Sequence, residues 1–147
     1  MTDEEYVDIA IEIAKNAPLP YGAILVKDNE IIGRSDREVF VNKTPFTHAE
    51  LMAIENAIKD KEYGYDLYNK LEGCTLYCSC EPCMMCMGAI LYEGISKIVF
   101  AASLEDSNTY YCKENVVSTK TLANLLDSNI EIIGGILREK AIEIWKK

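Results

Sequence analysis

Two short patterns contain side chains that could bind a metal ion and move protons. Residues 47–50 read Thr-His-Ala-Glu and residues 82–86 read Pro-Cys-Met-Met-Cys, each where a helix is predicted to begin. Residues three apart on a helix lie about 5–6 Å from each other at Cβ, so Cys83 and Cys86 can reach one ion through Zn–S bonds of about 2.3 Å. His48 is the only histidine in the chain. The sequence therefore predicts zinc held by His48, Cys83 and Cys86.

Three protein ligands leave one position of a tetrahedral zinc ion open, as in catalytic sites. The pKa of a water or hydroxide ligand there falls from 15.7 to roughly 7, which makes it a nucleophile at neutral pH. Glu50 follows His48 by two residues. We predict that Glu50 is the catalytic residue, which takes the proton of this water and passes it to a substrate.

Each pattern alone has a simpler explanation. Thr47 and Glu50 have the spacing of a capping box, in which Glu50 would only satisfy the helix start. A Cys-x-x-Cys pair can be redox-active, and Cys80, Cys83 and Cys86 share the spacing of an iron–sulfur run that lacks its fourth cysteine and proline. The two patterns in this order favour zinc, and an iron–sulfur or thiol redox protein stays as an alternative.

The other sulfur-containing side chains are predicted to be buried. The helix from about Pro82 to before Gly94 is apolar on every side, which predicts a central helix covered all round. We expect the following residues to fill the core: Cys74, Cys78, Cys80, Cys112, Met84, Met85 and Met87.

Composition narrows the class of protein. The 147 residues suit one domain, residues 1–147, and the longest apolar stretch is too short to cross a bilayer. Clustered cysteines and an acidic N-terminal segment favour a cytoplasmic protein. The net charge of -9 makes a nucleic-acid partner unlikely and favours a small, uncharged substrate.

Strands alternate with helices along the chain, which predicts an α/β fold with three layers, an αβα sandwich around a central mixed five-stranded sheet. Thr2 and Glu5 form a capping box for the first helix. The predicted strands are residues 22–27, 30–34, 75–78, 97–101 and 130–133, with a tight turn at residues 28–29. Further helices are predicted at residues 48–60, 119–126 and 136–145.

The pattern H-x-E followed by P-C-x-x-C resembles the zinc-dependent cytidine deaminase superfamily. Residues 75–90 look most like the subgroup of guanine deaminases, cytosine deaminases and tRNA adenosine deaminases. The resemblance implies the cytidine deaminase-like fold, hydrolytic release of ammonia from an amino-heterocycle and a homodimer. It places Tyr21 and the Ala49 backbone at the base pocket. Guanine or cytosine is the favoured substrate, and a tRNA adenosine-to-inosine deaminase is the alternative.

The sequence departs from that subgroup after the second strand. Relatives usually have a substrate-binding asparagine there, whereas this chain reads Ser-Asp-Arg-Glu at residues 35–38 and has its nearest asparagine at Asn42. Asp36 or Asn42 could replace it, and a pocket built on Asp36 would accept hydrogen bonds only. Residues 106–112 are either a loop over the pocket or an ordinary turn, and Trp145 either packs in the core or caps a site.

Overall fold

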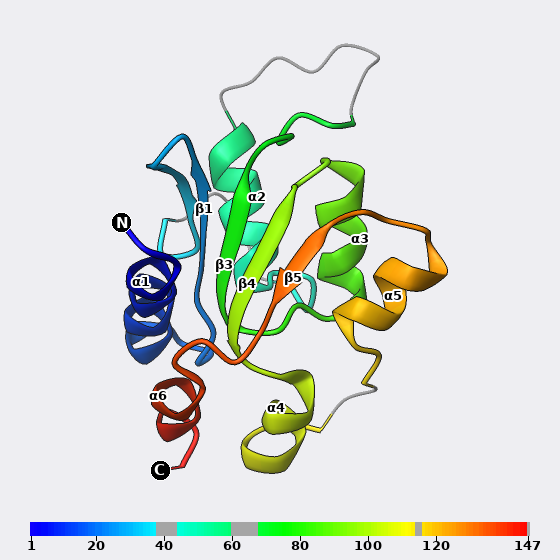
Figure 1. Cartoon of the computed structure of the whole chain (residues 1–147). Helices are drawn as coiled ribbons and strands as arrows, with labels where there is room; N and C mark the ends of the chain where they lie inside the picture. Colours follow the sequence, from blue (N-terminus) through cyan, green and yellow to red (C-terminus); the bar gives the residue numbers. More distant parts are fainter. Residues whose placement is uncertain (38–43, 60–67, 114–115, 147) are drawn as a thin grey trace.

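A mixed five-stranded sheet forms the centre of the molecule (Figure 1). The computed structural model describes residues 1–37, 44–59, 68–113 and 116–146. The strand order is β2-β1-β3-β4-β5, in which β3, β4 and β5 run parallel and β1 is antiparallel to both neighbours. The strands are β1 (Ala23–Lys27), β2 (Glu30–Arg34), β3 (Thr75–Cys80), β4 (Lys97–Ala102) and β5 (Glu131–Ile133).

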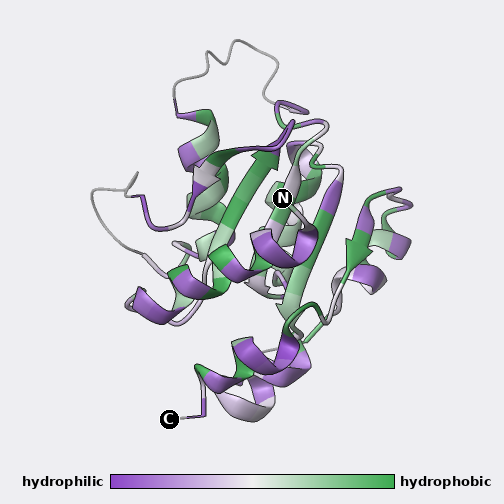
Figure 2. Cartoon of the chain, turned by 60° about the vertical axis from the view of Figure 1, so that its left-hand side comes forward, coloured by the Kyte–Doolittle hydropathy of each residue, from purple (hydrophilic) through white to green (hydrophobic). Residues whose placement is uncertain are grey.

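Helices cover both faces of this sheet, which confirms the predicted three layers. Two hydrophobic clusters lie on opposite sides of the strands, one under α1 and α6 and the other under α2, α3 and α5. Figure 2 shows hydrophobic residues concentrated in the strands. The helices are α1 (Asp3–Asn16), α2 (Ala49–Ile58), α3 (Met84–Tyr92), α4 (Leu104–Tyr110), α5 (Thr119–Leu125) and α6 (Arg138–Glu143).

Local signals at the N-terminal end are confirmed. The hydroxyl of Thr2 accepts from Glu5 N at 3.2 Å, and Glu5 Oε2 accepts from Thr2 N at 3.0 Å. The predicted capping box therefore forms at the start of α1. Asp28 and Asn29 have φ values of 50° and 64°. Positive φ at both central residues matches the right-handed twist of a hairpin, so these residues join β1 to β2.

Helices α4 and α6 differ from the prediction. The segment from residue 106, predicted as a loop or turn, belongs to helix α4, which starts with a capping box between Ser103 and Asp106. The last helix begins at Arg138 and not at residue 136, because its N-cap Leu137 has a φ of 57°, outside the helical region. Within the described ranges, no helix has the length and apolar character that a membrane span requires.

The prediction that α3 is covered on every side is wrong. Met87 and Ile90 are buried, but Met84 is 57% exposed and Tyr92 is 66% exposed. An evenly apolar sequence does not reveal which side of a helix meets the sheet. One side of α3 therefore contributes to the core, and another lies at the molecular surface.

Candidate active site

His48 is the N-cap of α2, and Gly33 fixes the distance between that helix and the sheet. A Cβ at Gly33 would lie 2.2 Å from Ala53 O, so only glycine allows β2 and α2 to pack this closely. The backbone of His48 donates to Phe46 O at 2.9 Å and accepts from Met52 N at 2.9 Å. Its side chain makes no capping hydrogen bond to the helix. The imidazole instead faces the start of α3.

Cys83 is the N-cap of α3, directly after β3. The prediction that this helix begins near Pro82 is wrong by two residues, since Met84 is the first helical residue. Cys83 O accepts from Met87 N at 2.8 Å, and its side chain makes no capping bond. Cys86 lies in the first turn and is fully buried. Both thiols therefore lie at the carboxyl end of β3.

The three predicted metal ligands converge. His48 Nδ1 lies 3.5 Å from Cys83 Sγ and 3.5 Å from Cys86 Sγ, and the two sulfurs are 3.7 Å apart. A tetrahedral zinc ion separates two sulfur ligands by about 3.8 Å and a sulfur from a nitrogen ligand by about 3.6 Å. The spacing of the three atoms therefore fits zinc without rearrangement.

The charges of the two thiols also fit a dication. The hydrogen bond from Cys86 lowers the pKa of Cys83 to about 4, with help from His48 and against the effect of burial. The same hydrogen bond, followed by burial, raises the pKa of Cys86 far above its ordinary value. A metal-free pair shares one proton because two adjacent thiolates repel each other. Zinc binds both as thiolates and cancels that charge.

Glu50 completes the cluster from the first turn of α2. Its side chain is 5% exposed, and its Oε2 lies 3.2 Å from Cys86 Sγ. Burial raises the pKa of Glu50 to about 7. The capping-box explanation is wrong, since His48 and not Thr47 is the N-cap, and Thr47 Oγ1 accepts from Thr44 N at 2.9 Å.

Sequence comparison places all four residues in one known family. Residues 1–102 match the family described as the cytidine and deoxycytidylate deaminase zinc-binding region, and the match spans His48, Glu50, Cys83 and Cys86. The chain belongs to this family. It is a hydrolytic deaminase with a zinc cofactor, as the sequence predicted.

Curated relatives of the deaminase have different substrates in their names. The tRNA-specific adenosine deaminase of Buchnera aphidicola subsp. Schizaphis graminum is 33% identical over 147 residues, 97% of this chain and 90% of the relative. The guanine deaminase of Bacillus subtilis is 37% identical over 112 residues, 73% of this chain and 69% of the relative. Both support membership of the family.

Solved structures show the same fold. The guanine deaminase from Nitrosomonas europaea superposes with a TM-score of 0.79 at 22% identity, over 98% of this chain and 82% of that one. A structure from work on A-to-I editing by tRNA:A34 deaminases gives 0.72 at 22% identity, over 95% and 98%. The cytidine deaminase-like fold is therefore confirmed.

The remaining cysteines of the deaminase lie outside the metal cluster. Cys74, Cys78 and Cys80 are buried as predicted. Cys80 Sγ donates to Ser103 O at 3.8 Å, away from the metal ligands. The prediction that Cys112 is buried is wrong, because it follows the end of α4 and is exposed. Among the described residues, only His48, Cys83 and Cys86 form a cluster suited to a metal.

The predicted substrate-binding residues differ from one another in burial and in hydrogen-bond partners. Tyr21 Oη lies 2.9 Å from Ser107 Oγ of α4, and Ala49 is buried beside His48. The carboxylate of Asp36 is exposed and accepts two hydrogen bonds from the Arg34 guanidinium, at 2.9 and 3.0 Å. Asn42 lies outside the described residues. Their roles toward a substrate stay predictions.

An aromatic cluster surrounds Tyr21. Its ring centroid lies 5.7 Å from that of Tyr111 and 5.8 Å from that of Trp145. Trp145 is buried and its indole N–H donates to Pro20 O at 3.1 Å, in agreement with core packing. Ser107 is not marked by any pattern in the sequence, although the capping-box spacing of Ser103 and Asp106 could have indicated the helix that contains it.

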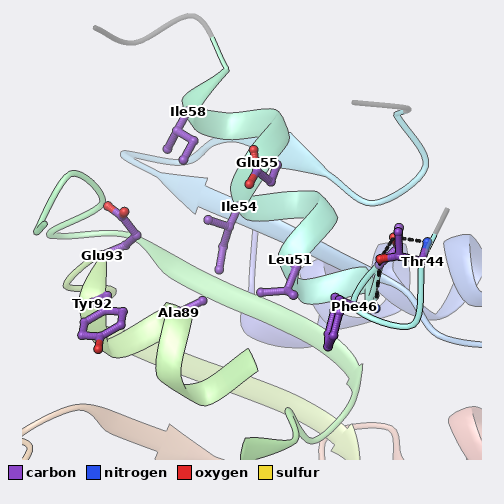
Figure 3. Close-up of a pocket in the computed structure, with 10 residues that line it drawn as sticks. Thr44, Phe46, Leu51, Ile54, Glu55, Ile58, Ala89, Tyr92 and Glu93 are labelled. Carbon is purple, nitrogen blue, oxygen red and sulfur yellow. Dashed lines mark hydrogen bonds between the residues drawn. The ribbon is translucent and has the colours of Figure 1, made fainter. Parts of the chain in front are cut away.

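A second feature is a hollow of about 350 Å³ between α2 and α3. Figure 3 shows the residues that line it. Its wall includes Leu51, Ile54 and Ile58 of α2 and Ala89 of α3. None of the metal-binding residues is among the described residues that line it. The hollow is therefore separate from the metal cluster, although the same two helices form both.

Proposed function

We propose that the deaminase removes the amino group of a free nucleobase or related small amino-heterocycle, with guanine and cytosine as the leading candidates. The observation that carries this proposal is the buried Glu50, whose Oε2 lies 3.2 Å from one sulfur of the three-ligand cluster. A proton-transferring carboxyl beside an ion with an open position is the arrangement that hydrolytic deamination requires.

Glu50 would move protons between water and the heterocycle. Bound zinc supplies a Lewis acid that lowers the pKa of water at its open position to roughly 7. Glu50 would accept a proton from the attacking water on Oε2 and donate it to the ring nitrogen beside the reacting carbon. A second transfer would protonate the leaving amine. The water oxygen stays on the ring as a carbonyl and ammonia departs. A buried carboxyl within reach of both the water and the ring can accept a proton and donate it again.

Charge supports a small substrate over a nucleic acid. The net charge is -9. Three basic side chains among the described C-terminal residues, up to residue 146, are also paired with acids: Arg138 with Asp106, Lys140 with Asp8 and Lys146 with Glu143. Binding to phosphates depends on Lys and Arg that can displace counterions, and these residues are already neutralised.

We assign the predicted pocket residues to recognition of the heterocycle. Tyr21 and Ala49 would form its wall, and Asp36 or Asn42 would hydrogen-bond its edge. A carboxylate offers about four acceptor positions. Arg34 occupies two of those of Asp36. The two that remain suit the N–H groups of a base such as guanine or cytosine.

A tRNA adenosine-to-inosine deaminase is the second candidate. It is favoured by the names of several relatives, among them the Buchnera enzyme that aligns over 97% of this chain. The chemistry at Glu50 would be the same, and only the partner would differ. Binding to tRNA would depend on Lys and Arg contacts to phosphates, so it would weaken as the salt concentration rises.

A screen of ammonia release separates these candidates. Zinc-loaded protein is incubated with guanine, cytosine, adenine, their nucleosides, pterins and amino-triazines, and inosine formation is measured on tRNA. We expect turnover of at least one free heterocycle by the wild type and turnover at least about 100-fold slower by Glu50→Gln. Inosine formation on tRNA alone would support the second candidate. Absence of all deamination would contradict both.

We also propose that the deaminase is a cytoplasmic homodimer whose two copies meet at the hollow between α2 and α3. That face contains both apolar projections, Phe46 and Tyr92, each 66% exposed, and an apolar hollow. A surface that carries both a projection and a hollow can pair with a second copy of itself, as a twofold interface requires. Its apolar wall does not suit a phosphate-rich partner. Six cysteines without disulfides agree with a reducing compartment.

Sedimentation velocity tests the dimer. We expect the wild type at twice the mass of the chain and Tyr92→Glu at the mass of one chain. The matched control is Leu125→Glu, which adds the same charge at an exposed leucine of α5 and should remain dimeric. A monomeric wild type, or a dimer unaffected by Tyr92→Glu, would contradict this interface.

A further inference from the structure

We propose that Glu81 is a positioning residue, which holds the Cys83 segment of the metal site against the first residues of α4 and α5. Glu81 follows β3 and is 7% exposed. Its Oε1 accepts from Leu104 N at 3.1 Å. Its Oε2 accepts from Thr119 N at 2.8 Å and from Thr119 Oγ1 at 2.8 Å. One buried side chain therefore joins three segments that are distant in sequence.

Both backbone partners of Glu81 are amides that their own helices cannot satisfy. Leu104 and Thr119 are the first residues of α4 and α5, and a first-turn N–H has no acceptor within its helix. The N-cap serines satisfy other amides, since Ser103 accepts from Asp106 N and Ser118 from Thr121 N. Thr119 is fully buried. Without Glu81, water could not replace its partner, and the donor would stay unsatisfied.

The metal site is the third segment in this arrangement. Glu81 precedes Cys83 by two residues, and its N–H donates to Ala102 O, at the end of β4, at 2.8 Å. Its backbone and side chain therefore fix the chain immediately before the N-cap of α3. A shift of Glu81 would move Cys83 Sγ relative to His48, and the 3.5 Å separation of these ligand atoms leaves little room for it.

Helix α4 extends the effect of Glu81 to the proposed substrate wall. Ser107 of α4 lies 2.9 Å from the Tyr21 hydroxyl. Because Glu81 holds the start of α4 through Leu104, it sets the position of Ser107 relative to the metal ligands. Mutation of a residue that orients a metal ligand without binding the metal typically lowers metal affinity or activity by about 10- to 100-fold. We assign Glu81 this positioning role at the metal site. Only its expected effect on substrate binding rests on the proposed function.

The variant Glu81→Gln tests the proposal because it keeps the size of the side chain and removes one acceptor. Its amide NH₂ would face a backbone N–H, so one of the two helix starts loses its partner. The matched control is Glu105→Gln, an exposed acid in the first turn of α4. Zinc affinity is measured by competition with a chelator well below the melting temperature, and Co²⁺-substituted protein reports ligand geometry through its visible spectrum.

We expect folded Glu81→Gln to bind zinc about 10-fold more weakly or worse, with a changed Co²⁺ spectrum and a raised KM. The Glu105→Gln control should match the wild type. A purely structural role would lower only the melting temperature, so wild-type affinity and an unchanged spectrum would overturn the proposal. The metal measurements need no substrate, so they stand even if the deamination screen fails.

A milder variant keeps the proposal testable if Glu81→Gln does not fold. Thr119→Val removes the hydroxyl donor and leaves both backbone bonds to Glu81. We expect a smaller loss of zinc affinity in the same direction and a small change in the Co²⁺ spectrum. Wild-type affinity together with an unchanged spectrum would contradict the positioning role.

Discussion

Four helices begin near the metal cluster, and they begin in two different ways. At α4 and α5 the N-cap is a serine whose hydroxyl accepts a backbone N–H of the first turn, at 3.0 Å for Ser103 and 3.1 Å for Ser118. At α2 and α3 the N-caps are His48 and Cys83, and neither side chain makes a capping hydrogen bond. The second pair instead supplies two of the three donor atoms that are positioned to bind a metal ion.

This difference shows that the same position, the N-cap of a helix, can serve either stability or metal binding. A serine cap stabilises a helix by about 1 kcal/mol relative to alanine. His48 and Cys83 give up that contribution so that their donor atoms can meet at one point. Zinc binding then offsets the loss, because free energy of metal binding contributes to folding. The starts of α2 and α3 should depend on metal, and those of α4 and α5 should not.

Loss of a metal ligand should have the largest effect. In His48→Ala and Cys83→Ser, we expect zinc to be lost and deamination to fall to background, because two ligands cannot hold a catalytic ion. Hydrogen exchange should become faster in the first turns of α2 and α3 and stay unchanged in those of α4 and α5. Metal analysis and exchange mass spectrometry check this. Equal acceleration at all four starts would remove the distinction.

Glu50→Gln should have the next largest effect, and it should affect only the chemistry. We expect kcat to fall by about 10²–10⁴-fold, the usual contribution of general acid–base catalysis, because an amide cannot carry the proton. Zinc content should stay at one ion per chain, since Glu50 is not a ligand in the predicted site. Steady-state kinetics with metal analysis measure both. Normal turnover in a zinc-loaded variant would show that Glu50 does not move protons.

Most of the fold could be predicted from the sequence, because its signals are local. Buried strands read as short apolar runs, and the caps at Thr2 and Ser118 lie next to the helices they start. Helix α4 was missed because its mostly polar sequence, in which Leu104 is the one aliphatic residue, shows no apolar periodicity. The exposed side of α3 could not be seen either, because an all-apolar helix gives no indication of which side meets the sheet.

The site was predictable on its metal side and not on its substrate side. His48, Cys83 and Cys86 can be identified because few residue types bind zinc and their spacing is distinctive. The contact of Tyr21 with Ser107 joins residues 86 positions apart, and no local pattern encodes it. The capping-box spacing of Thr47 and Glu50 was misleading, since such a pattern fits a cap and a catalytic acid equally well.

A smaller effect is expected at the serine-capped starts. Ser118→Ala should lower the free energy of unfolding by about 1 kcal/mol, because Thr121 N loses its acceptor at the start of α5. Zinc content and kcat should stay at wild-type values, in contrast to the ligand variants. Urea unfolding and metal analysis test this. Loss of zinc from Ser118→Ala would show that the serine cap itself, and not only the hydrogen bonds from α5 to Glu81, affects the metal site.

The smallest effect concerns the carboxylate in the capping box of α4. Arg138 donates two hydrogen bonds to Asp106, at 2.9 and 2.7 Å, and this lowers the pKa of Asp106 below its usual 3.8. A lowered pKa contributes stability above the unfolded value, and the contribution disappears as pH falls through the folded value. Arg138→Met should therefore lower the free energy of unfolding only slightly at neutral pH, since the Arg138 side chain is exposed and its ion pair is screened by water. Urea unfolding of the metal-free protein measures this difference in the free energy of unfolding between wild type and variant. We expect the difference to shrink below about pH 4, and a difference independent of pH would exclude the ion pair as its cause.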